Sequence, residues 1–175
     1  MNIYDEIFAS DPNYNAVIDY KLDVVLGWVK KNNFRHLLDV GCGRGHYLKL
    51  LSEKGIKVTG LEPSKFIADT LKDYEVVNDD ILGLGKKGKE WEALICMDAL
   101  EHIEPTEIEE TIKALASLSP RALLGIANHS DKWRGTELHL IREDPWWWVS
   151  LLSKHYRSVK GVYTSKRYFM YEAIR

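Results

Sequence analysis

The chain has 175 residues, of which 45% are hydrophobic, enough for one domain with a sizeable core. Its formal net charge is −2 and its pI is near 6.3, which gives no indication of nucleic-acid binding. The apolar runs are too short to cross a membrane, and the first residues lack the pattern of a signal peptide. Cys42 and Cys96 lie in apolar, strand-like runs, so we expect a reducing, cytoplasmic setting without disulfides.

The first half of the chain alternates helical and strand patterns without repeats or low-complexity segments. Residues 16–30 carry Val17, Tyr20, Val24 and Trp28 at helical spacing, which predicts an amphipathic helix. Further along, we expect strands at 35–41, 56–62 and 75–78, a helix after the first strand, and a helix at 64–74. The segment 83–89 is rich in glycine and lysine, which is typical of a surface loop.

The second half continues the alternation and ends in two strands. We expect strands at 91–97, 122–127, 158–164 and 167–174, and helices from 105 to 120 and from 145 to 155. The last two strands must be antiparallel, because the few residues between them cannot form a crossover connection. The remaining alternation favours a parallel sheet covered on both faces. The pattern therefore predicts an α/β fold with one antiparallel strand near the edge of the sheet.

The most informative segment runs from Leu37 to Leu48, where an apolar strand passes into glycines at every second position. Glycine permits a tight turn and a close approach of the backbone to a ligand. The helix that begins near Gly45 would direct free N–H groups toward that turn. The dinucleotide pattern G-x-G-x-x-G is not met, because the third glycine comes one residue early and His46 occupies its place.

Asp39-x-Gly41-x-Gly43-x-Gly45 instead resembles motif I of the class I S-adenosylmethionine-dependent methyltransferases. The segment 98–103, Asp-Ala-Leu-Glu-His-Ile, is similar to that family's stretch after the fourth strand. The resemblance implies a Rossmann-like three-layer sandwich with a seven-stranded, mostly parallel sheet, and S-adenosylmethionine as cofactor. A Glu-x-His sequence before a tryptophan-rich helix resembles small single-domain methyltransferases from surface-glycan gene clusters and some viral genomes.

We expect a single methyltransferase domain over residues 1–175. Its parts would be an N-terminal helical cover (1–33), a cofactor-binding half (34–129) and a C-terminal part with the acceptor loop, the tryptophan-rich helix and the terminal strands (130–175).

The cofactor should lie at the carboxyl ends of the strands, where open α/β sheets bind ligands. Glu62 follows the second strand, 21 residues after Gly41, where an acidic side chain can accept hydrogen bonds from ribose hydroxyls. By resemblance, Asp80 would accept from the adenine amine and Met97 would offer a main-chain carbonyl to the methionine amino group. The full set of expected cofactor-binding residues is Asp39, Gly41, Gly43, Gly45, Glu62, Pro63, Asp79, Asp80, Ile81 and Met97.

Charge also favours this cofactor over a nucleotide. The acidic residues of the candidate pocket are Asp39, Glu62, Asp79, Asp80, Asp98 and Glu101. Only Arg44 and His46 oppose them, so a pyrophosphate would be repelled, whereas a sulfonium and an ammonium would be attracted.

The candidate acceptor site is the long connection 130–144. Glu137 and His139 are two residues apart, so an extended backbone would point both to one face, where His139 could act as general base. The same pair could instead hold the loop closed.

His102 is a further catalytic candidate, or it makes local hydrogen bonds and has a structural role together with Glu101. His129, Asp131, Glu137 and His139 are all metal-ligand types, but their positions across a loop are not fixed by sequence, and we expect no metal.

Several acceptors remain open at this stage. A small-molecule or glycan hydroxyl ranks first, an amine second, and RNA or protein last, because no RNA-binding appendage or strongly basic face is present. Residues 131–175 carry 9 basic and 5 acidic side chains, which suits an anionic acceptor or merely a solvated face.

Three adjacent tryptophans, 146–148, cannot all face the core, so one could cover the acceptor, stack on a ring or contact a second subunit in a homodimer. A catalytically inactive cofactor-binding subunit and a nucleotide-binding oxidoreductase are the alternatives from other classes. We expect no membrane association.

Overall fold

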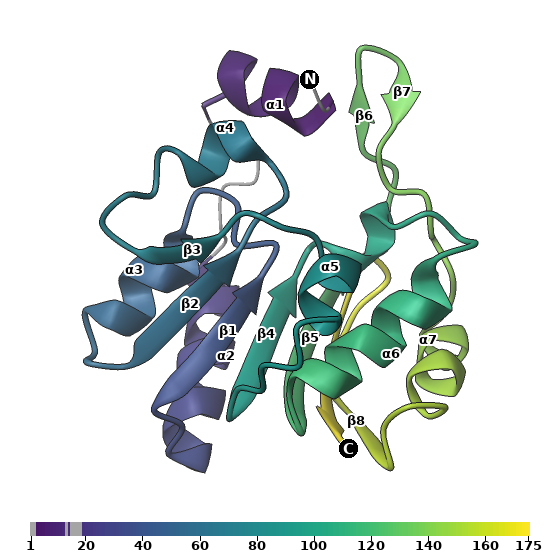
Figure 1. Cartoon of the computed structure of the whole chain (residues 1–175). Coiled ribbons are helices and arrows are strands. Elements are labelled where there is room, and N and C mark those ends of the chain that lie inside the picture. Colours follow the sequence, from purple (N-terminus) through teal and green to yellow (C-terminus); the bar gives the residue numbers. More distant parts are fainter. Residues whose placement is uncertain (1–2, 13, 15–18) are drawn as a thin grey trace. The chain divides into compact units, whose positions relative to one another are not determined.

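The computed structural model describes residues 3–12, 14 and 19–175, and the chain divides into two compact units, residues 1–80 and 81–175 (Figure 1). Each unit carries its own part of the α/β pattern. The first contains three strands and the second contains the four strands that complete the expected seven.

The first unit alternates helices with parallel strands. Its elements are α1 (Ile3–Ser10), α2 (Asp19–Asn32), β1 (His36–Val40), α3 (His46–Ser52), β2 (Lys57–Leu61), α4 (Lys65–Ala68) and β3 (Glu75–Val77). Strand β2 pairs in parallel with β1 on one side and β3 on the other, with Leu61 opposite both Val40 and Val77. The carboxyl ends of all three strands therefore lie at one edge. The expected helix over 16–30 corresponds to α2, while Val17 lies outside the described residues.

Helix α4 is shorter than the sequence pattern suggested, so the prediction of a helix over 64–74 is wrong in extent. Ser64 caps its start by accepting a hydrogen bond from the Ile67 N–H. The helix ends at Ala68, where the hydroxyl of Thr70 donates to the Ile67 carbonyl. Side-chain bonds of this kind compete with the helical ladder and favour turns.

The second unit contains the remaining elements. They are α5 (Ile81–Gly85), β4 (Ala93–Met97), the 3₁₀ helix η1 (Leu100–His102), α6 (Ile108–Leu118), β5 (Arg121–Ala127), β6 (Lys132–Trp133), β7 (Thr136–Glu137), α7 (Pro145–Leu152), β8 (Ser158–Thr164) and β9 (Tyr168–Ile174). Strands β4 and β5 are parallel, and β9 runs antiparallel to both β5 and β8. Strand β9 is thus antiparallel to both of its neighbours and lies next to the edge strand β8, as predicted. Helix α6 packs in front of β4 and β5 (Figure 1).

The segment 83–89 was expected to be a loop, and this is wrong for its first part, which belongs to α5. The helix buries Leu84, and it lies in close contact with α6 at Gly85. A Cβ atom at Gly85 would lie 3.1 Å from the Cβ atom of Ala114. Glycine at this position therefore reflects close helix packing rather than a mobile loop.

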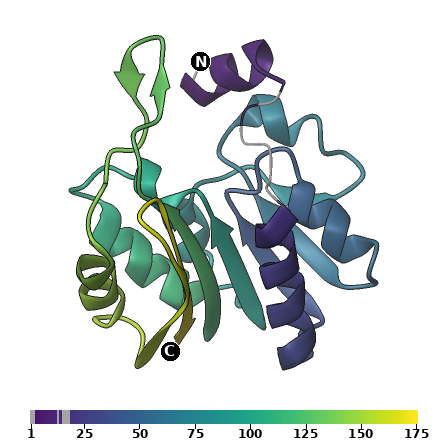
Figure 2. The same ribbon diagram turned by 180° about the vertical axis from the view of Figure 1, so that it is seen from behind.

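The connection after β5 contains a two-stranded hairpin, β6–β7, that projects away from the strands of its unit (Figures 1 and 2). Its two turn residues, Arg134 and Gly135, have φ angles of 47° and 86°. Positive φ at both positions is what a two-residue turn of type I′ requires. Sequence reasoning missed this hairpin because each strand has only two residues.

Helix α7 begins at Pro145, as expected, and ends at Leu152, three residues before the expected end. The carboxylate of Asp144 caps its start by accepting the N–H groups of Trp146 and Trp147. The three tryptophans separate as their spacing predicted. Trp148 is buried, Trp146 is 79% exposed, and Trp147 packs edge-on against Trp148 and lines a surface groove beside α6. Within the described ranges, the structure has no helix that is long and apolar enough to cross a membrane.

Candidate functional site

The glycine motif forms the turn between β1 and α3 in the first unit. Gly41, Gly43 and Gly45 have φ angles of 69°, 49° and 75°, all in the left-handed region that favours glycine. At Gly45 a Cβ atom would also lie only 2.8 Å from a methyl group of Leu71. Both the backbone conformation and the packing therefore require glycine, which explains the spacing of the motif.

Glu62 ties this turn to the end of β2. Its buried carboxylate accepts hydrogen bonds from the backbone N–H of Gly43 (2.9 Å) and of Ser64 (2.8 Å). Burial raises the pKa of Glu62, and the two backbone hydrogen bonds oppose that rise. Asn78, which the sequence reasoning overlooked, donates its amide to the Glu62 carbonyl (2.8 Å) and so joins the end of β3 to that of β2.

Asp39 is the most unusual acidic group of the first unit. It is 1% exposed, and its Oδ2 atom has no hydrogen-bond partner within the described part of the chain. Burial, together with the charge of Glu62, raises the pKa of Asp39 to about 8. A buried carboxylate without a partner is costly unless a cation compensates for its charge.

The other expected cofactor-binding residues differ in their surroundings. Asp79 accepts the backbone N–H of Asp80 (2.9 Å), and Pro63 is exposed in the turn after Glu62. Ile81 begins α5, and Met97 ends β4, so these two belong to the second unit. There the hydroxyl of Tyr168, another residue that sequence reasoning missed, lies 3.9 Å from the Met97 sulfur.

Arg44 does not point its charge into the glycine turn. Its guanidinium donates to the carbonyls of Phe8 and Asp11, both at 2.8 Å, and lies over the Phe8 ring. The hydroxyl of Ser64 donates to the carboxylate of Asp5. Helix α1 is thereby fastened beside α4, as both ribbon views show (Figures 1 and 2). The one arginine that we counted against a cationic ligand is thus engaged with the N-terminal helix.

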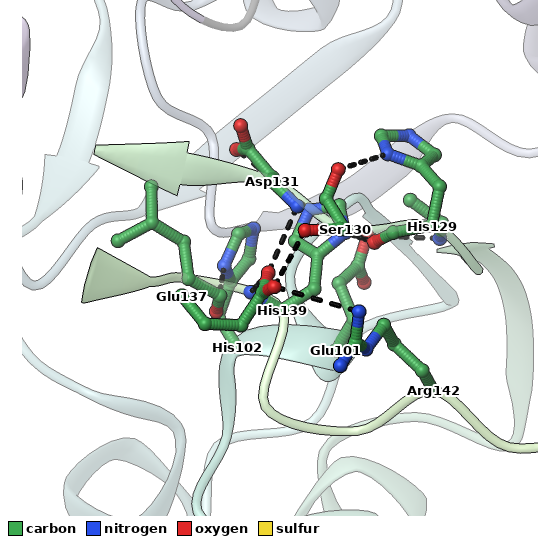
Figure 3. A network of polar contacts seen from close by, with 10 residues as sticks. Glu101, His102, His129, Ser130, Asp131, Glu137, His139 and Arg142 are labelled. Atoms are coloured by element: carbon green, nitrogen blue, oxygen red, sulfur yellow. Dashed lines mark hydrogen bonds and ion pairs between the residues drawn. The ribbon is translucent and has the colours of Figure 1, made fainter. Parts of the chain in front are cut away.

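In the second unit, η1 holds the acceptor-loop candidate in place (Figure 3). Glu101 is fully buried, and its Oε1 atom accepts the Ala127 N–H (2.8 Å) at the end of β5. Its main-chain carbonyl accepts the N–H groups of Leu140 (2.7 Å) and Ile141 (3.1 Å). The Nδ1 atom of His102 lies 2.9 Å from the Leu138 carbonyl. Residues 138–141 are therefore locked onto η1.

His139 lies between the rings of two other histidines. Its ring centroid is 4.8 Å from that of His102 and 4.9 Å from that of His129, and its Nδ1 atom is 2.6 Å from the His129 carbonyl. Burial lowers the pKa of His139 and lowers the pKa of His102 to about 4. Both rings are consequently neutral at neutral pH.

Glu137 does not pair with the His139 ring, and its bonds are those of the alternative interpretation, in which it holds the loop closed. Its Oε1 atom accepts the backbone N–H of Asp131 (2.8 Å) and of His139 (3.2 Å), and Oε2 accepts the Ser130 hydroxyl (2.6 Å). These bonds, led by that of Ser130, lower the pKa of Glu137 to about 2, which makes it a weak base. The carboxylate near the ring is that of Asp131, 3.9 Å from Nε2 of His139.

We predict that Glu137→Ala loosens the loop without unfolding the unit. Three N–H or O–H donors would lose their acceptor at once, and the hairpin would lose its tie to the segment before His139. Limited proteolysis should cut residues 130–141 several-fold faster. Glu143→Ala, at an exposed position nearby, is the matched control and should leave the cleavage rate unchanged. Equal cleavage of both variants would contradict the role given to Glu137.

Comparison with solved structures defines the class of fold. The chain superimposes on a SAM-dependent methyltransferase from Archaeoglobus fulgidus with a TM-score of 0.69, 16% identity, and coverage of 88% of this chain and 94% of that one. It also matches magnesium protoporphyrin IX methyltransferase from Synechocystis PCC 6803, solved with bound SAM, with a TM-score of 0.66, 20% identity, and coverage of 89% and 78%. These likenesses confirm the predicted α/β, Rossmann-like fold with a mostly parallel sheet.

The family follows from the sequence. Residues 15–162 match the model of the methyltransferase domain, so the chain belongs to this family, and the predicted membership of the class I S-adenosylmethionine-dependent methyltransferases is confirmed. The ubiquinone biosynthesis O-methyltransferase of Coxiella burnetii is 29% identical over 107 residues, which are 56% of this chain and 46% of that protein. The chain thus spans about half the length of this curated relative.

Proposed function

We propose that this chain binds S-adenosylmethionine and transfers its methyl group to a hydroxyl group of a small molecule or glycan. The observation that carries the first part is the buried acidic group of Asp39 beside the left-handed glycine turn, because a cationic ligand there would favour its charged form. The O-methyltransferase relative favours a hydroxyl acceptor. Methylation of an amine, RNA or protein, and an inactive cofactor-binding subunit, are the alternatives.

The residues of the first unit suit this cofactor. When bound, S-adenosylmethionine supplies an electrophilic methyl group on a sulfonium, and it carries an ammonium that Asp39 can balance. Each carboxylate oxygen of Glu62 accepts one backbone N–H and keeps a lone pair for a ribose hydroxyl. Asp79 and Asp80 would accept from the adenine amine. Gly41, Gly43 and Gly45 would allow close approach of the backbone, with Pro63 in the following turn.

We assign the remaining roles to residues of the second unit. Ile81 would pack against the adenine, and the Met97 carbonyl would accept from the ammonium. The neutral rings of His102 and His139 are the candidates to accept the proton of an acceptor hydroxyl, and Glu137 would hold their loop in place. Cys42 and Cys96 are buried and form no disulfide within the described residues, which suits a reducing compartment, and we place the enzyme in the cytoplasm.

Isothermal titration calorimetry tests the cofactor assignment. We expect S-adenosylmethionine and its demethylated product to bind with micromolar dissociation constants and NAD to bind at least tenfold more weakly, because the acidic ligands repel a pyrophosphate. Tighter binding of NAD would overturn the assignment. A screen of hydroxyl and amine compounds with a labelled methyl donor then identifies the acceptor, and transfer only to amines would overturn the hydroxyl preference.

A further inference from the structure

We propose that Glu101, His102 and His139 form a binding site for a divalent transition-metal ion such as Zn²⁺, Mn²⁺ or Co²⁺. This site differs from the set His129, Asp131, Glu137 and His139 that the sequence made conceivable, and it replaces our expectation of a metal-free protein. Its role in acceptor binding rests on the proposed function, whereas the binding of the ion does not.

The three side chains already have a spacing that a small ion can close. One ligand atom from each of Glu101, His102 and His139 lies within 4.8 Å of the others. A tetrahedral ion with ligand bonds of about 2.1 Å holds its ligand atoms roughly 3.4 Å apart. Modest side-chain rotations are therefore enough, and two imidazoles with one carboxylate are a ligand set that zinc uses in catalytic sites.

Hydrogen bonds prepare both histidines as ligands. In each ring the Nδ1 atom faces a main-chain carbonyl, that of Leu138 for His102 (2.9 Å) and that of His129 for His139 (2.6 Å). A carbonyl only accepts, so Nδ1 must carry the proton, and Nε2 keeps the lone pair that a metal needs. This pairing of a metal-ligating histidine with a carbonyl is the usual arrangement around bound metals.

The backbone fixes the three residues relative to one another although they come from two separate segments. The Glu101 carbonyl accepts the N–H groups of residues 140 and 141, and the Glu101 carboxylate accepts the N–H of Ala127. Figure 3 shows Glu101, His102 and His139 gathered where these segments meet. Ligands held before the ion arrives lose little conformational entropy on binding.

The surrounding charge favours a cation. Besides Glu101, the carboxylates of Asp98 and Asp131 lie close enough to His102 to act on its charge. Arg142 pairs with Glu137 at 3.4 Å. Two neutral imidazoles among three carboxylates leave a net negative cluster, which a divalent ion would neutralise. Three protein ligands leave a position open, where the oxygen of an acceptor hydroxyl could bind and be oriented.

Cobalt provides a direct test on the untagged full chain after treatment with a chelator. Titration with Co²⁺ should develop visible d–d absorption that saturates at one ion per chain. His102→Gln and His139→Gln should each weaken Co²⁺ binding at least tenfold, because one of three ligands is lost. His155→Gln, at a histidine near Glu109 in the same unit, is the matched control and should bind Co²⁺ as the parent does.

A variant that gains an absorption band distinguishes loss of a ligand from failure to fold. His139→Cys should add a thiolate-to-Co²⁺ charge-transfer band, because thiolates bind such ions well, and His155→Cys should not. No saturable Co²⁺ absorption in the parent, or no new band in His139→Cys, would overturn the site. Binding of S-adenosylmethionine is measured separately, with chelator present. If the cofactor binds but Co²⁺ does not, the metal site alone is rejected. If Co²⁺ binds but the cofactor does not, the proposed function alone is rejected.

Discussion

Replacing His139 with alanine should lower the turnover number by about two to four orders of magnitude, the usual contribution of a positioned catalytic group. The ring is 5% exposed, lies against His102, and offers Nε2 for a proton or an ion. The affinity for S-adenosylmethionine should stay unchanged, because the residues that we assign to the ribose and the ammonium belong to other segments. Steady-state kinetics with the acceptor, together with calorimetry of the cofactor, measure both quantities.

The same variant distinguishes catalysis from loop structure. A purely structural His139 would raise the acceptor KM, leave kcat nearly unchanged and expose residues 130–144 to proteolysis. His129→Ala is the matched control, because it removes a neighbouring ring but keeps the main-chain carbonyl that His139 contacts. A kcat within threefold of the parent in His139→Ala would contradict a role in the chemistry.

Asp39→Asn should have opposite effects on cofactor binding and on the stability of the free protein. At pH 8 the loss of a hydrogen-bonded charge should weaken binding of S-adenosylmethionine by roughly 1.5–3 kcal/mol, or about tenfold to more than a hundredfold. The free variant should nevertheless unfold at a higher temperature than the parent at that pH. The amide has nearly the same shape but does not have to place a charge in a buried site.

The pH dependence of stability follows from the raised pKa of Asp39. Between pH 4 and about 8 the folded protein keeps a proton that the unfolded chain has lost. The contribution of Asp39 to the free energy of unfolding is thus fully present below pH 4 and is lost as the pH rises toward 8. Thermal melts from pH 5 to 8 should show a steeper fall for the parent than for Asp39→Asn. Asp73→Asn, at an exposed turn, is the control, and identical slopes for all three proteins would contradict the buried charge.

Local sequence patterns were sufficient to predict most of the helices and strands and the glycine turn. The period of apolar residues predicted α2, α6 and α7, and the short link between β8 and β9 required them to be antiparallel. These features depend on neighbours in the sequence, so they could be derived from it. The helix at 81–85 and the early end of α4 were missed, because packing against Ala114 and the Thr70 hydroxyl decide them.

By itself, the sequence determined the class of this protein. The left-handed φ angles at Gly41, Gly43 and Gly45 can be adopted readily only by glycine, so the motif can be recognised from the sequence. Glu62 could also be predicted as a cofactor-binding residue, from its sequence distance to that motif. The sequence did not reveal that its carboxylate accepts a hydrogen bond from the Gly43 N–H.

Only the tertiary structure decided what surrounds the histidines. The bond from His102 to Leu138 joins residues 36 positions apart, and the Glu101 carbonyl meets the N–H groups of the returning chain at 140–141. Such contacts depend on how a long connection closes, and main-chain carbonyls and N–H groups have no signature in the side-chain sequence. The sequence left open whether Glu137 assists the His139 ring or holds the loop closed. The fold uses Glu137 to hold the loop and brings Glu101 and His102 to His139, because the backbone donors of the loop compete for the Glu137 carboxylate.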